Sequence, residues 1–423
     1  MKSGFLNHFA FATALACAGY ATATENAPLK FAFGDRAPEA GWTQVAATSV
    51  YSTKAGFGFE PGLPRQSEAT AGAEISGKDF LTSEKPFLFS IKLPEGNYAV
   101  TALINDKEGK AVTTVKAEQR RLMLEKMQFH PGTLAARTFI VNVRTARISD
   151  TKKVKLKQRE LETETVDWDD KLTLEFDGTH PTLRALVIAP TNMPTVYLAG
   201  DSTVCDQPAE PWNSWGQMLP RFFRPDVAVA NYAESGETIK SSLGAYRFDK
   251  IFSLMKPGDY LFVQFGHNDQ KDKATNALAT YKANLKKIVA RTRELGGTPV
   301  LVTSMERKKG VEENTLAGYP DTVRAVAKEE YCALIDLNAM SKVFYRALGT
   351  DLDKAFQDGT HHNNYGSYEL AKCVVAGIQQ VKLPLAKSIV ADFGDFDPAK
   401  PDAVATFEMP ASPTVSKEKP LGN

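Results

Sequence analysis

The sequence contains few cysteines, no excess of charge of one sign and, after its first segment, no long hydrophobic run. Four cysteines in 423 residues form no C-x-x-C pair, which argues against a disulfide framework and a cysteine-based metal site. Its 51 basic and 50 acidic residues leave a net charge of +1, which argues against a dedicated nucleic-acid-binding protein. Beyond residue 23 no segment approaches the ~20 apolar residues of a membrane-spanning helix, so we expect no membrane span.

The first segment, residues 1–23, is the exception. Lys2 precedes an apolar run over residues 5–20, and small residues follow at 21–23. This pattern predicts a secretory signal peptide cut after Ala23. A second interpretation stays open, in which Cys17 is the acylated residue of a lipoprotein signal. We therefore expect a secreted or periplasmic protein, exported freely or anchored to lipid through Cys17.

Three cysteines remain after such a cleavage, Cys205, Cys332 and Cys373. They allow one disulfide at most, and the pair Cys332 and Cys373 is the favoured one. The sequence does not establish that pair.

Residues 28–190 have the hydrophobic period of β-strands. Apolar residues alternate over 87–93 and again over 98–104, on either side of the turn Pro94-Glu95-Gly96-Asn97. This arrangement predicts a β-hairpin with one buried face. Similar short runs recur at 139–143, 172–176 and 183–188. Together they favour an all-β sandwich.

A run rich in charge covers residues 152–164, where Val154 and Leu156 alternate with lysines. We interpret it as the solvated face of a strand. The alternative interpretation is a patch that binds an anionic polymer.

The hydrophobic period changes in residues 194–385, where short apolar runs alternate with longer helical patterns. One such pattern, from Tyr281 to Leu295, has apolar residues three and four apart and stops at Gly296-Gly297. This alternation predicts a parallel sheet covered by helices on both faces, an α/β domain. The predicted buried strands lie at 196–199, 227–229, 260–263, 300–303 and 334–336. Residues 386–423 show no periodicity and predict an extended C-terminal tail.

Chemistry-bearing residues follow the predicted parallel strands. Ser202 comes directly after the first strand, Gly236 follows the second, and Asn268 follows the third. Ligands bind beyond the carboxyl ends of such strands, so Ser202 is a candidate nucleophile, with Gly236 and Asn268 as oxyanion donors. Asp358 and His361, three residues apart before the last helix, fit the acid and base of a triad.

These blocks resemble, in order, those of the SGNH (GDSL-like) hydrolase superfamily, and most closely bacterial rhamnogalacturonan acetylesterases. The resemblance rests on GDSTVCDQ, NYAESG, FGHNDQK and DGTHHNNYG. It implies a flavodoxin-like three-layer α/β/α domain with the triad Ser202, His361 and Asp358, and an oxyanion hole from Ser202, Gly236 and Asn268. It implies no cofactor. The stretch FAFGDRAPEAGWTQV resembles the β-rich, galactose-binding-like accessory domain that often precedes such esterases.

Two other histidines compete for the role of base. Asp177-Gly178-Thr179-His180 repeats the same four letters, but it lies between two predicted strands of the β half, where Asp-Gly is an ordinary turn. His362 adjoins His361, but only His361 keeps the Asp-x-x-His spacing. We expect His362 at the cleft rim or against substrate.

Several further residues are candidate substrate contacts: His267, His362, Trp212 and Arg307. Helix packing is the favoured role for Trp215, and a structural role for His267 stays open. At Glu306-Arg307-Lys308 the sequence departs from the family, which more often shows consecutive arginines there. The six histidines lack metal-ligand spacing, so no metal is implied.

The resemblance predicts a serine esterase that removes acetyl groups from rhamnogalacturonan through an acetyl-enzyme intermediate. The alternatives are an esterase for another acetylated glycan, such as acetylxylan, and a non-catalytic carbohydrate-binding protein. The expected partner is an acetylated polysaccharide or oligosaccharide, with no nucleic acid. The oligomeric state stays open.

Overall fold

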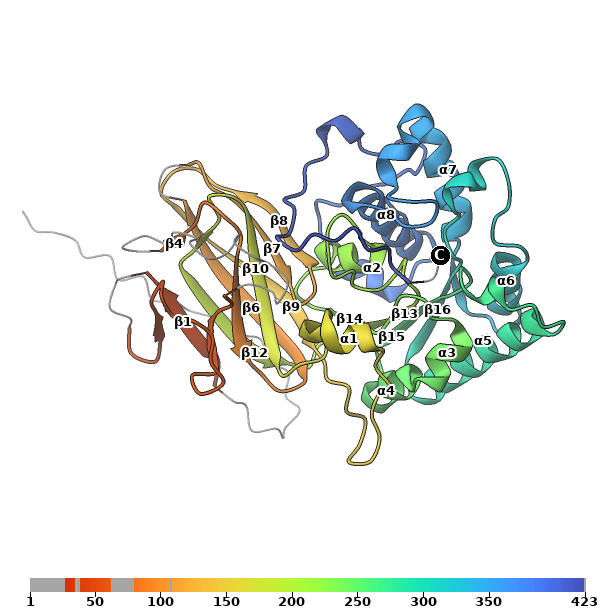
Figure 1. Cartoon of the computed structure of the whole chain (residues 1–423), viewed down its shortest axis with the longest axis horizontal. Coiled ribbons are helices and arrows are strands. Elements are labelled where there is room, and N and C mark those ends of the chain that lie inside the picture. Colours follow the sequence, from red (N-terminus) through yellow and green to blue (C-terminus); the bar gives the residue numbers. More distant parts are fainter. Residues whose placement is uncertain (1–26, 35–38, 62–79, 107–108, 422–423) are drawn as a thin grey trace, which may run out of the picture.

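The structure is a computed structural model that describes residues 27–34, 39–61, 80–106 and 109–421. The predicted signal peptide and Cys17 lie outside these residues. Figure 1 shows a β-sandwich on one side of the molecule and a half rich in helices on the other.

The sandwich consists of two five-stranded sheets, in the orders β2-β1-β12-β6-β9 and β3-β5-β10-β7-β8. Their alternating apolar side chains meet in one core, in which Phe89, Phe176 and Val100 are fully buried. A two-stranded sheet pairs β11 with β4. The strands are β1 Leu29–Phe33, β2 Thr43–Val45, β3 Phe57–Phe59, β4 Leu81–Thr82, β5 Phe87–Lys92, β6 Gly96–Asp106, β7 Val112–Ala117, β8 Arg121–Gln128, β9 Thr133–Val143, β10 Lys171–Thr179, β11 Thr182–Leu183 and β12 Ala185–Thr191.

The predicted hairpin of β5 and β6 is wrong, although both strands exist. β5 pairs with β3 and β10, whereas β6 pairs with β12 and β9 in the opposite sheet. The alternation of apolar residues specifies which face of a strand is buried and leaves its partner open. Residues 93–95 therefore cross between the sheets, and both strands face the same core.

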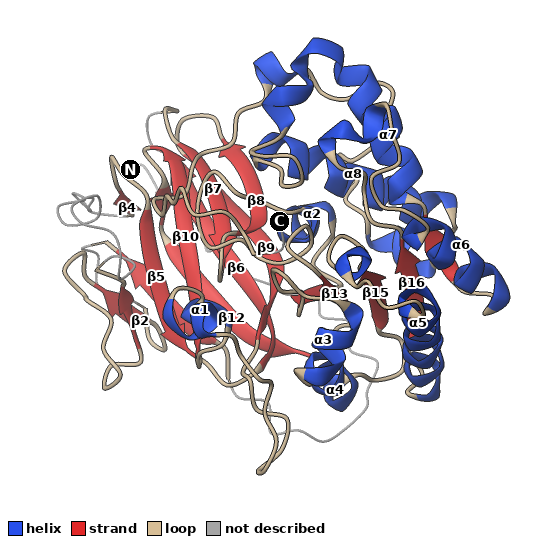
Figure 2. Ribbon diagram, turned by 45° about the vertical axis from the view of Figure 1, so that its right-hand side comes forward, coloured by secondary structure: helices blue, strands red, loops and turns tan. Residues whose placement is uncertain are grey.

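The second half has a parallel sheet with the order β14-β13-β15-β16-β17. Figure 2 shows the helices that pack around it. The helices α2, α7 and α8 supply one apolar cluster against the sheet, and α3 to α6 supply another. The two clusters cover the two faces of the sheet, so this half has three layers, α/β/α. The strands are β13 Thr195–Gly200, β14 Ala228–Asn231, β15 Tyr260–Gln264, β16 Thr298–Val302 and β17 Ala333–Ile335.

The helical pattern after β15 forms α5, Ala277–Glu294. Tyr281, Leu285 and Ile288 are buried on its inner face, as their spacing predicts. The α-helices are α1 Gln158–Glu162, α2 Trp215–Met218, α3 Ile239–Gly244, α4 Arg247–Leu254, α5, α6 Tyr319–Glu329, α7 Leu337–Leu348 and α8 Asn364–Gln380. Short 3₁₀ helices are η1 Thr165–Asp167, η2 Leu219–Phe222, η3 Asp269–Lys271, η4 Lys308–Val311, η5 Gly349–Ala355, η6 Pro384–Ser388 and η7 Val404–Thr406.

The charged run at 152–164 is not the solvated strand that its alternation predicts. It contains α1, and the side chains of Glu160 and Glu164 are buried. Glu160 pairs with Arg247 of α4 at 2.5 Å, so the segment packs on the α/β half. Lys157 and Glu160 of this run thus pair with residues that are distant in the chain, Glu237 and Arg247.

The C-terminal tail is extended and contacts both halves (Figure 1). Lys116 of β7 donates to Ser412 Oγ at 2.7 Å, and the tail forms a β-bridge from Val415 to Glu210. Leu421 reaches the loop after β14, where an added Cβ on Gly236 would lie 3.1 Å from Leu421 Cβ.

In the described part of the chain, no helix is long and apolar enough to span a bilayer. Cys205, Cys332 and Cys373 are free thiols, so the favoured disulfide between Cys332 and Cys373 is not formed. The Cys332 thiol instead donates to the carbonyl of Pro299, and Cys373 is buried in α8.

Candidate active site

Ser202 lies in the tight turn that follows β13. Gly200 precedes it with no room for a side chain, because an added Cβ would lie 2.6 Å from Val204 Cγ2. Asp201 Oδ1 accepts hydrogen bonds from the amide and the hydroxyl of Thr203, at 3.0 and 2.8 Å. Gln207 Nε2 donates to the Ser202 carbonyl at 2.6 Å. These contacts fix the serine at the carboxyl edge of the sheet.

Three side chains predicted to act together form one hydrogen-bonded series. Ser202 Oγ lies 2.8 Å from His361 Nε2, and His361 Nδ1 lies 2.9 Å from Asp358 Oδ2. The serine and histidine are each 1% exposed. This geometry lets the imidazole take the hydroxyl proton while the carboxylate holds the ring.

Asp358 is held as a carboxylate by its own loop. Its Oδ1 accepts hydrogen bonds from the backbone amides of Thr360 and His361, both at 2.7 Å. Burial alone would raise its pKa, but these bonds and the His361 ring hold the pKa well below its usual value. A permanent negative charge therefore faces the imidazole.

The two predicted oxyanion donors lie on neighbouring loops. Gly236 follows β14 in a left-handed conformation with φ of +76°, which favours glycine. Asn268 follows β15, and its Nδ2 donates to the Glu237 carbonyl at 3.1 Å. An amide nitrogen carries two hydrogens, so this bond leaves one N–H of Asn268 for an oxyanion. The Asn268 oxygen accepts from Lys271 at 3.1 Å, which fixes the amide orientation.

His362 does not lie at the cleft rim. It is buried, its ring stacks on Tyr345, and its Nε2 lies 2.9 Å from the Tyr345 hydroxyl. Burial lowers the pKa of His362 to about 3. The side chain points into the core because His361 and His362 are adjacent in an extended stretch, where neighbours face opposite sides.

Of the other candidate contacts, His267 is buried in a hydrogen-bonded position. Its Nδ1 lies 3.3 Å from Asp201 Oδ2 and its Nε2 lies 3.0 Å from the Met305 carbonyl. Arg307, half-buried, donates to Thr360 Oγ1 at 3.1 Å and to the His267 carbonyl at 3.1 Å. These two side chains connect the site loops to one another.

Both tryptophans after Ser202 are buried. Trp212 packs edge-on against the His361 ring, with centroids 5.9 Å apart, and its Nε1 donates to the Ser416 carbonyl at 3.2 Å. Trp215 donates to Gln264 at 2.8 Å and fills the core beneath the sheet, which confirms its packing role.

The repeated tetrapeptide is separate from this site. His180 lies in the turn between β10 and β11 with φ of +47°, and it pairs with Glu84 at 3.2 Å. Asp177 is buried in the sandwich beside Lys116, at 2.6 Å. His180 is confirmed as a turn residue, whereas Asp177 and Gly178 belong to β10, so the expected Asp-Gly turn is wrong.

Sequence reasoning missed two groups that reach the oxyanion loop, Lys157 and Leu421. Lys157 Nζ donates to the Ser235 carbonyl at 2.5 Å and pairs with Glu237 at 2.7 Å. Neither residue belongs to a recognisable motif, because each acts through a loop far away in the chain.

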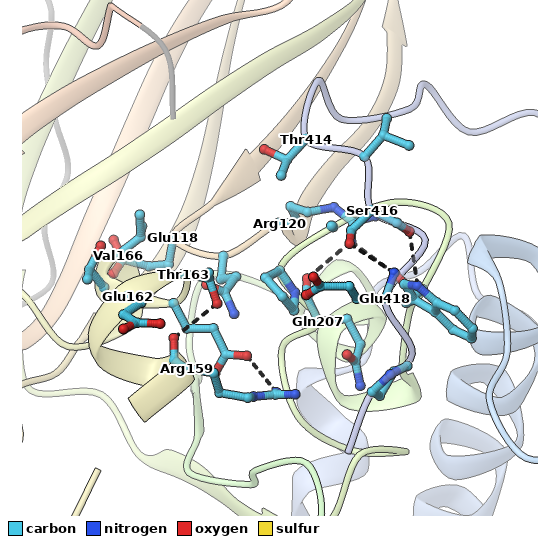
Figure 3. Close-up of a pocket in the computed structure, with 18 of the residues that line it drawn as sticks. Glu118, Arg120, Arg159, Glu162, Thr163, Val166, Gln207, Thr414, Ser416 and Glu418 are labelled. Atoms are coloured by element: carbon cyan, nitrogen blue, oxygen red, sulfur yellow. Dashed lines mark hydrogen bonds and ion pairs between the residues drawn. The ribbon is translucent and has the colours of Figure 1, made fainter. Parts of the chain in front are cut away.

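A cavity of about 410 Å³ lies behind Trp212, between the sandwich, the α1 segment and the tail. Figure 3 shows Arg120, Arg159 and Gln207 around it, with Thr414 and Ser416 of the tail on another wall. Arg120 is already paired with Glu210 at 2.5 Å. Trp212 lines this cavity and also packs against the His361 ring.

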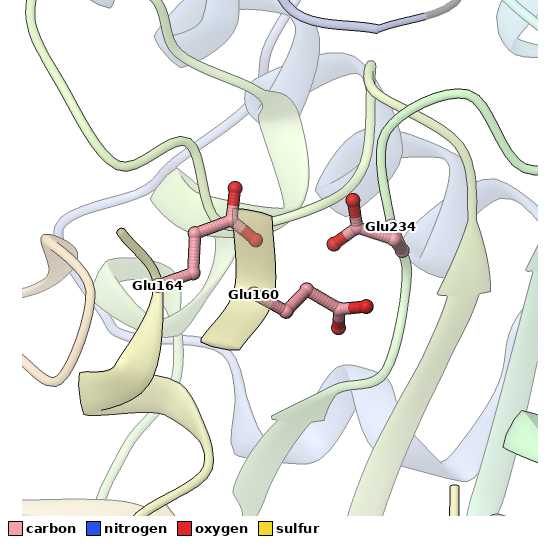
Figure 4. Close-up of side chains that lie close together, drawn as sticks. All are labelled: Glu160, Glu164 and Glu234. Carbon is pink, nitrogen blue, oxygen red and sulfur yellow. The ribbon is translucent and has the colours of Figure 1, made fainter. Parts of the chain in front are cut away.

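Next to this cavity, Glu160, Glu164 and Glu234 bring their carboxylates within 4.8 Å of one another (Figure 4). Arg159 pairs with Glu164 at 2.5 Å and with Glu234 at 3.2 Å. Burial and the neighbouring Glu234 raise the pKa of Glu164 well above its usual value. Arginine side chains thus supply the positive charge inside this cluster.

Comparison with known proteins places these features in a family. Residues 198–367 match the profile of the GDSL-like lipase/acylhydrolase family, and residues 29–145 match a galactose-binding-like domain of β-agarase and YXIM-type esterases. The chain is 38% identical to the rhamnogalacturonan acetylesterase RhgT of Bacillus subtilis over 221 residues, which cover 47% of this chain and 95% of RhgT.

Another relative matches across both halves. The uncharacterized esterase YxiM of Bacillus subtilis is 26% identical over 381 residues, covering 85% of this chain and 92% of YxiM. A crystal structure of the Bacillus subtilis YxiM protein is 25% identical, covers 84% of this chain and 99% of its own, and has a TM-score of 0.46.

A parallel α/β sheet with Ser202 at its carboxyl edge, preceded by a galactose-binding-like sandwich, defines a hydrolase of the SGNH class. The chain belongs to the GDSL-like lipase/acylhydrolase family, and it is a serine esterase.

Proposed function

We propose that this esterase is exported and removes acetyl groups from a pectic polysaccharide, rhamnogalacturonan. The observation that carries the proposal is the unbroken series Asp358, His361 and Ser202, with 2.9 and 2.8 Å between hydrogen-bonded atoms. The likeness to RhgT supports the choice of glycan. The apolar segment after Lys2 supports export.

The reaction begins when Ser202 Oγ attacks the acetyl carbonyl carbon and His361 Nε2 takes the serine proton. The carbonyl oxygen becomes an oxyanion, which the backbone amides of Ser202 and Gly236 and the side-chain amide of Asn268 stabilise. His361 then gives its proton to the departing sugar oxygen, and an acetyl-enzyme remains. Water then attacks the acetyl carbon while His361 takes its proton, the bond from that carbon to Ser202 Oγ breaks to release acetate, and His361 returns the proton to Oγ.

The decisive experiment measures acetate released from acetylated rhamnogalacturonan, acetylxylan and a small acetyl ester. We expect the highest kcat/KM on acetylated rhamnogalacturonan. Ser202→Ala should lower kcat on every substrate by several orders of magnitude, because it removes only the attacking oxygen. Ser253→Ala, the same change on α4, is the matched control and should keep full activity.

A preference for acetylxylan would replace the proposed substrate and leave the mechanism intact. Near-normal activity of Ser202→Ala would refute the nucleophile. Absence of acetate release from all three substrates would refute the acetylesterase function.

A further inference from the structure

Lys157 lies outside the segment that matches the family profile, yet its side chain ends at the catalytic loop. It directly precedes α1, and its backbone amide donates to Glu160 Oε2 at 2.8 Å, which anchors the residue. Its Nζ donates to the Ser235 carbonyl at 2.5 Å. The same Nζ pairs with Glu237 Oε1 at 2.7 Å, and Glu237 Oε2 in turn accepts from Ser241 at 2.5 Å.

The Ser235 carbonyl and the Gly236 N–H belong to one peptide unit. In a planar trans peptide the C=O and N–H bonds point in opposite directions. A cation held at the carbonyl oxygen therefore fixes the direction of the N–H and draws electron density away from it. Hydrogen bonds that share a group polarise one another in this way.

Gly236 makes such a restraint necessary. Its φ of +76° is a conformation that glycine adopts freely, and a glycine backbone also reaches the alternative conformations at little cost. Rotation of this peptide would turn the N–H away from the oxyanion and present the carbonyl oxygen instead. The Lys157 ammonium opposes that rotation, because it would lose its acceptor.

We propose that Lys157 is a positioning residue for acyl transfer: it orients and polarises the Ser235–Gly236 peptide so that the Gly236 N–H stabilises the oxyanion. The inference rests on the proposed function, in which Gly236 is an oxyanion donor. It gives the segment between β9 and β10 an indirect part in the reaction. Lys157 itself does not touch the reacting atoms.

The test compares kcat and KM of the full-length protein with those of Lys157→Met on a small acetyl ester. Loss of a complete oxyanion donor typically lowers kcat by 10²–10³-fold, so a donor that is misdirected part of the time should cost roughly 10-fold, with KM nearly unchanged. Lys157→Arg should recover most of kcat, because it restores a cation. Lys153→Met, the same change at an exposed lysine of the segment, is the control and should match the parent.

A second measurement separates positioning from general damage. A trifluoromethyl ketone that adds to Ser202 forms a tetrahedral oxyanion, so its inhibition constant should rise in Lys157→Met by about the factor by which kcat/KM falls. The thermal midpoint should fall, because the buried Glu237 loses its ammonium partner, but the protein should stay folded at the assay temperature. If Lys157→Met does not fold, Lys157→Gln, which keeps a donor without charge, gives the same comparison.

An unchanged kcat and inhibition constant in folded Lys157→Met, with Ser202→Ala inactive, would overturn this inference and leave the proposed function standing. A fall in kcat without weaker binding of the ketone would also overturn it. A parent protein that hydrolyses no acetyl ester would overturn both.

Discussion

His361 and His362 are neighbours in the chain and have opposite surroundings. His361 faces Ser202 and Asp358 at hydrogen-bonding distance. His362 is packed between Tyr345 and Phe356 in the core. Neighbouring side chains of an extended backbone point to opposite sides. One of these two histidines therefore faces the serine as the candidate base, and the next one packs in the core.

This difference predicts distinct effects on activity. His361→Ala should fall to about the level of Ser202→Ala, and the double variant should be little slower than either, since the residues act as one unit. His362→Gln should lower the stability of the protein and leave kcat nearly unchanged. Steady-state kinetics on a small acetyl ester measure all four variants. Full activity of His361→Ala would show that another group acts as the base.

The buried His362 also predicts acid sensitivity. Because its pKa in the folded protein is about 3, below the ordinary 6.5, the unfolded chain binds more protons between these values. The contribution of neutral His362 to the free energy of unfolding is complete above pH 6.5. It is lost as the pH falls toward 3, by up to about 1.4 kcal/mol per pH unit. His362→Gln lacks this dependence, so urea unfolding should show a smaller drop in stability from pH 7 to pH 4.5. Equal drops in both proteins would contradict the prediction.

At the scale of elements, the parallel strands were predictable and the sandwich pairing was not. β13 to β17 are short buried apolar runs, Ser202 follows β13 closely, and Asp358 and His361 stand in one local motif before α8, so sequence identified both the strands and these residues. The partners of β5 and β6 depend on contacts across the core, which a period of two does not encode. For the same reason the ion pairs of residues 157–164 and the contact of Trp212 with the tail could not be predicted: their partners are distant in sequence.

The tail itself predicts a stability effect. Ser412 donates its amide to Glu210 at 3.1 Å, Ser416 donates to the Glu210 carbonyl at 2.8 Å, and Trp212 donates to Ser416. Each such hydrogen bond contributes about 1 kcal/mol, and in a protein of this size such losses lower Tm by several degrees. Removal of residues 410–423 should therefore lower the midpoint measured by calorimetry. Lys417→Ala, at an exposed tail position, is the control; an unchanged Tm after truncation would mean that the tail does not stabilise the fold.

At the scale of the whole molecule, the sandwich and the α/β half share a buried ionic interface. Arg121 of β8 is 1% exposed and pairs with Asp206 at 2.9 Å and with Asp167 at 3.3 Å. Arg120 donates to the carbonyls of Gln207 and Trp212 at 3.1 and 3.0 Å. The sandwich thus holds the loop that leads from Ser202 to Trp212, and burial raises the pKa of Asp206 to about 6 even with an arginine beside it.

This interface predicts that the α/β half does not fold on its own. A protein that begins at Asn192 would leave Asp206 and the loop carbonyls without their arginines, so we expect insoluble or inactive protein, judged by gel filtration and ester hydrolysis. In the full chain, Arg121→Met should cost about 3 kcal/mol of unfolding free energy, because Arg144 alone would then face the two buried carboxylates of Asp167 and Asp206. Arg137→Met, at an exposed arginine of β9, is the matched control and should cost far less. A soluble, fully active protein from Asn192 onward would show that the α/β half needs neither the sandwich nor Lys157, and would therefore contradict the positioning role of that lysine as well.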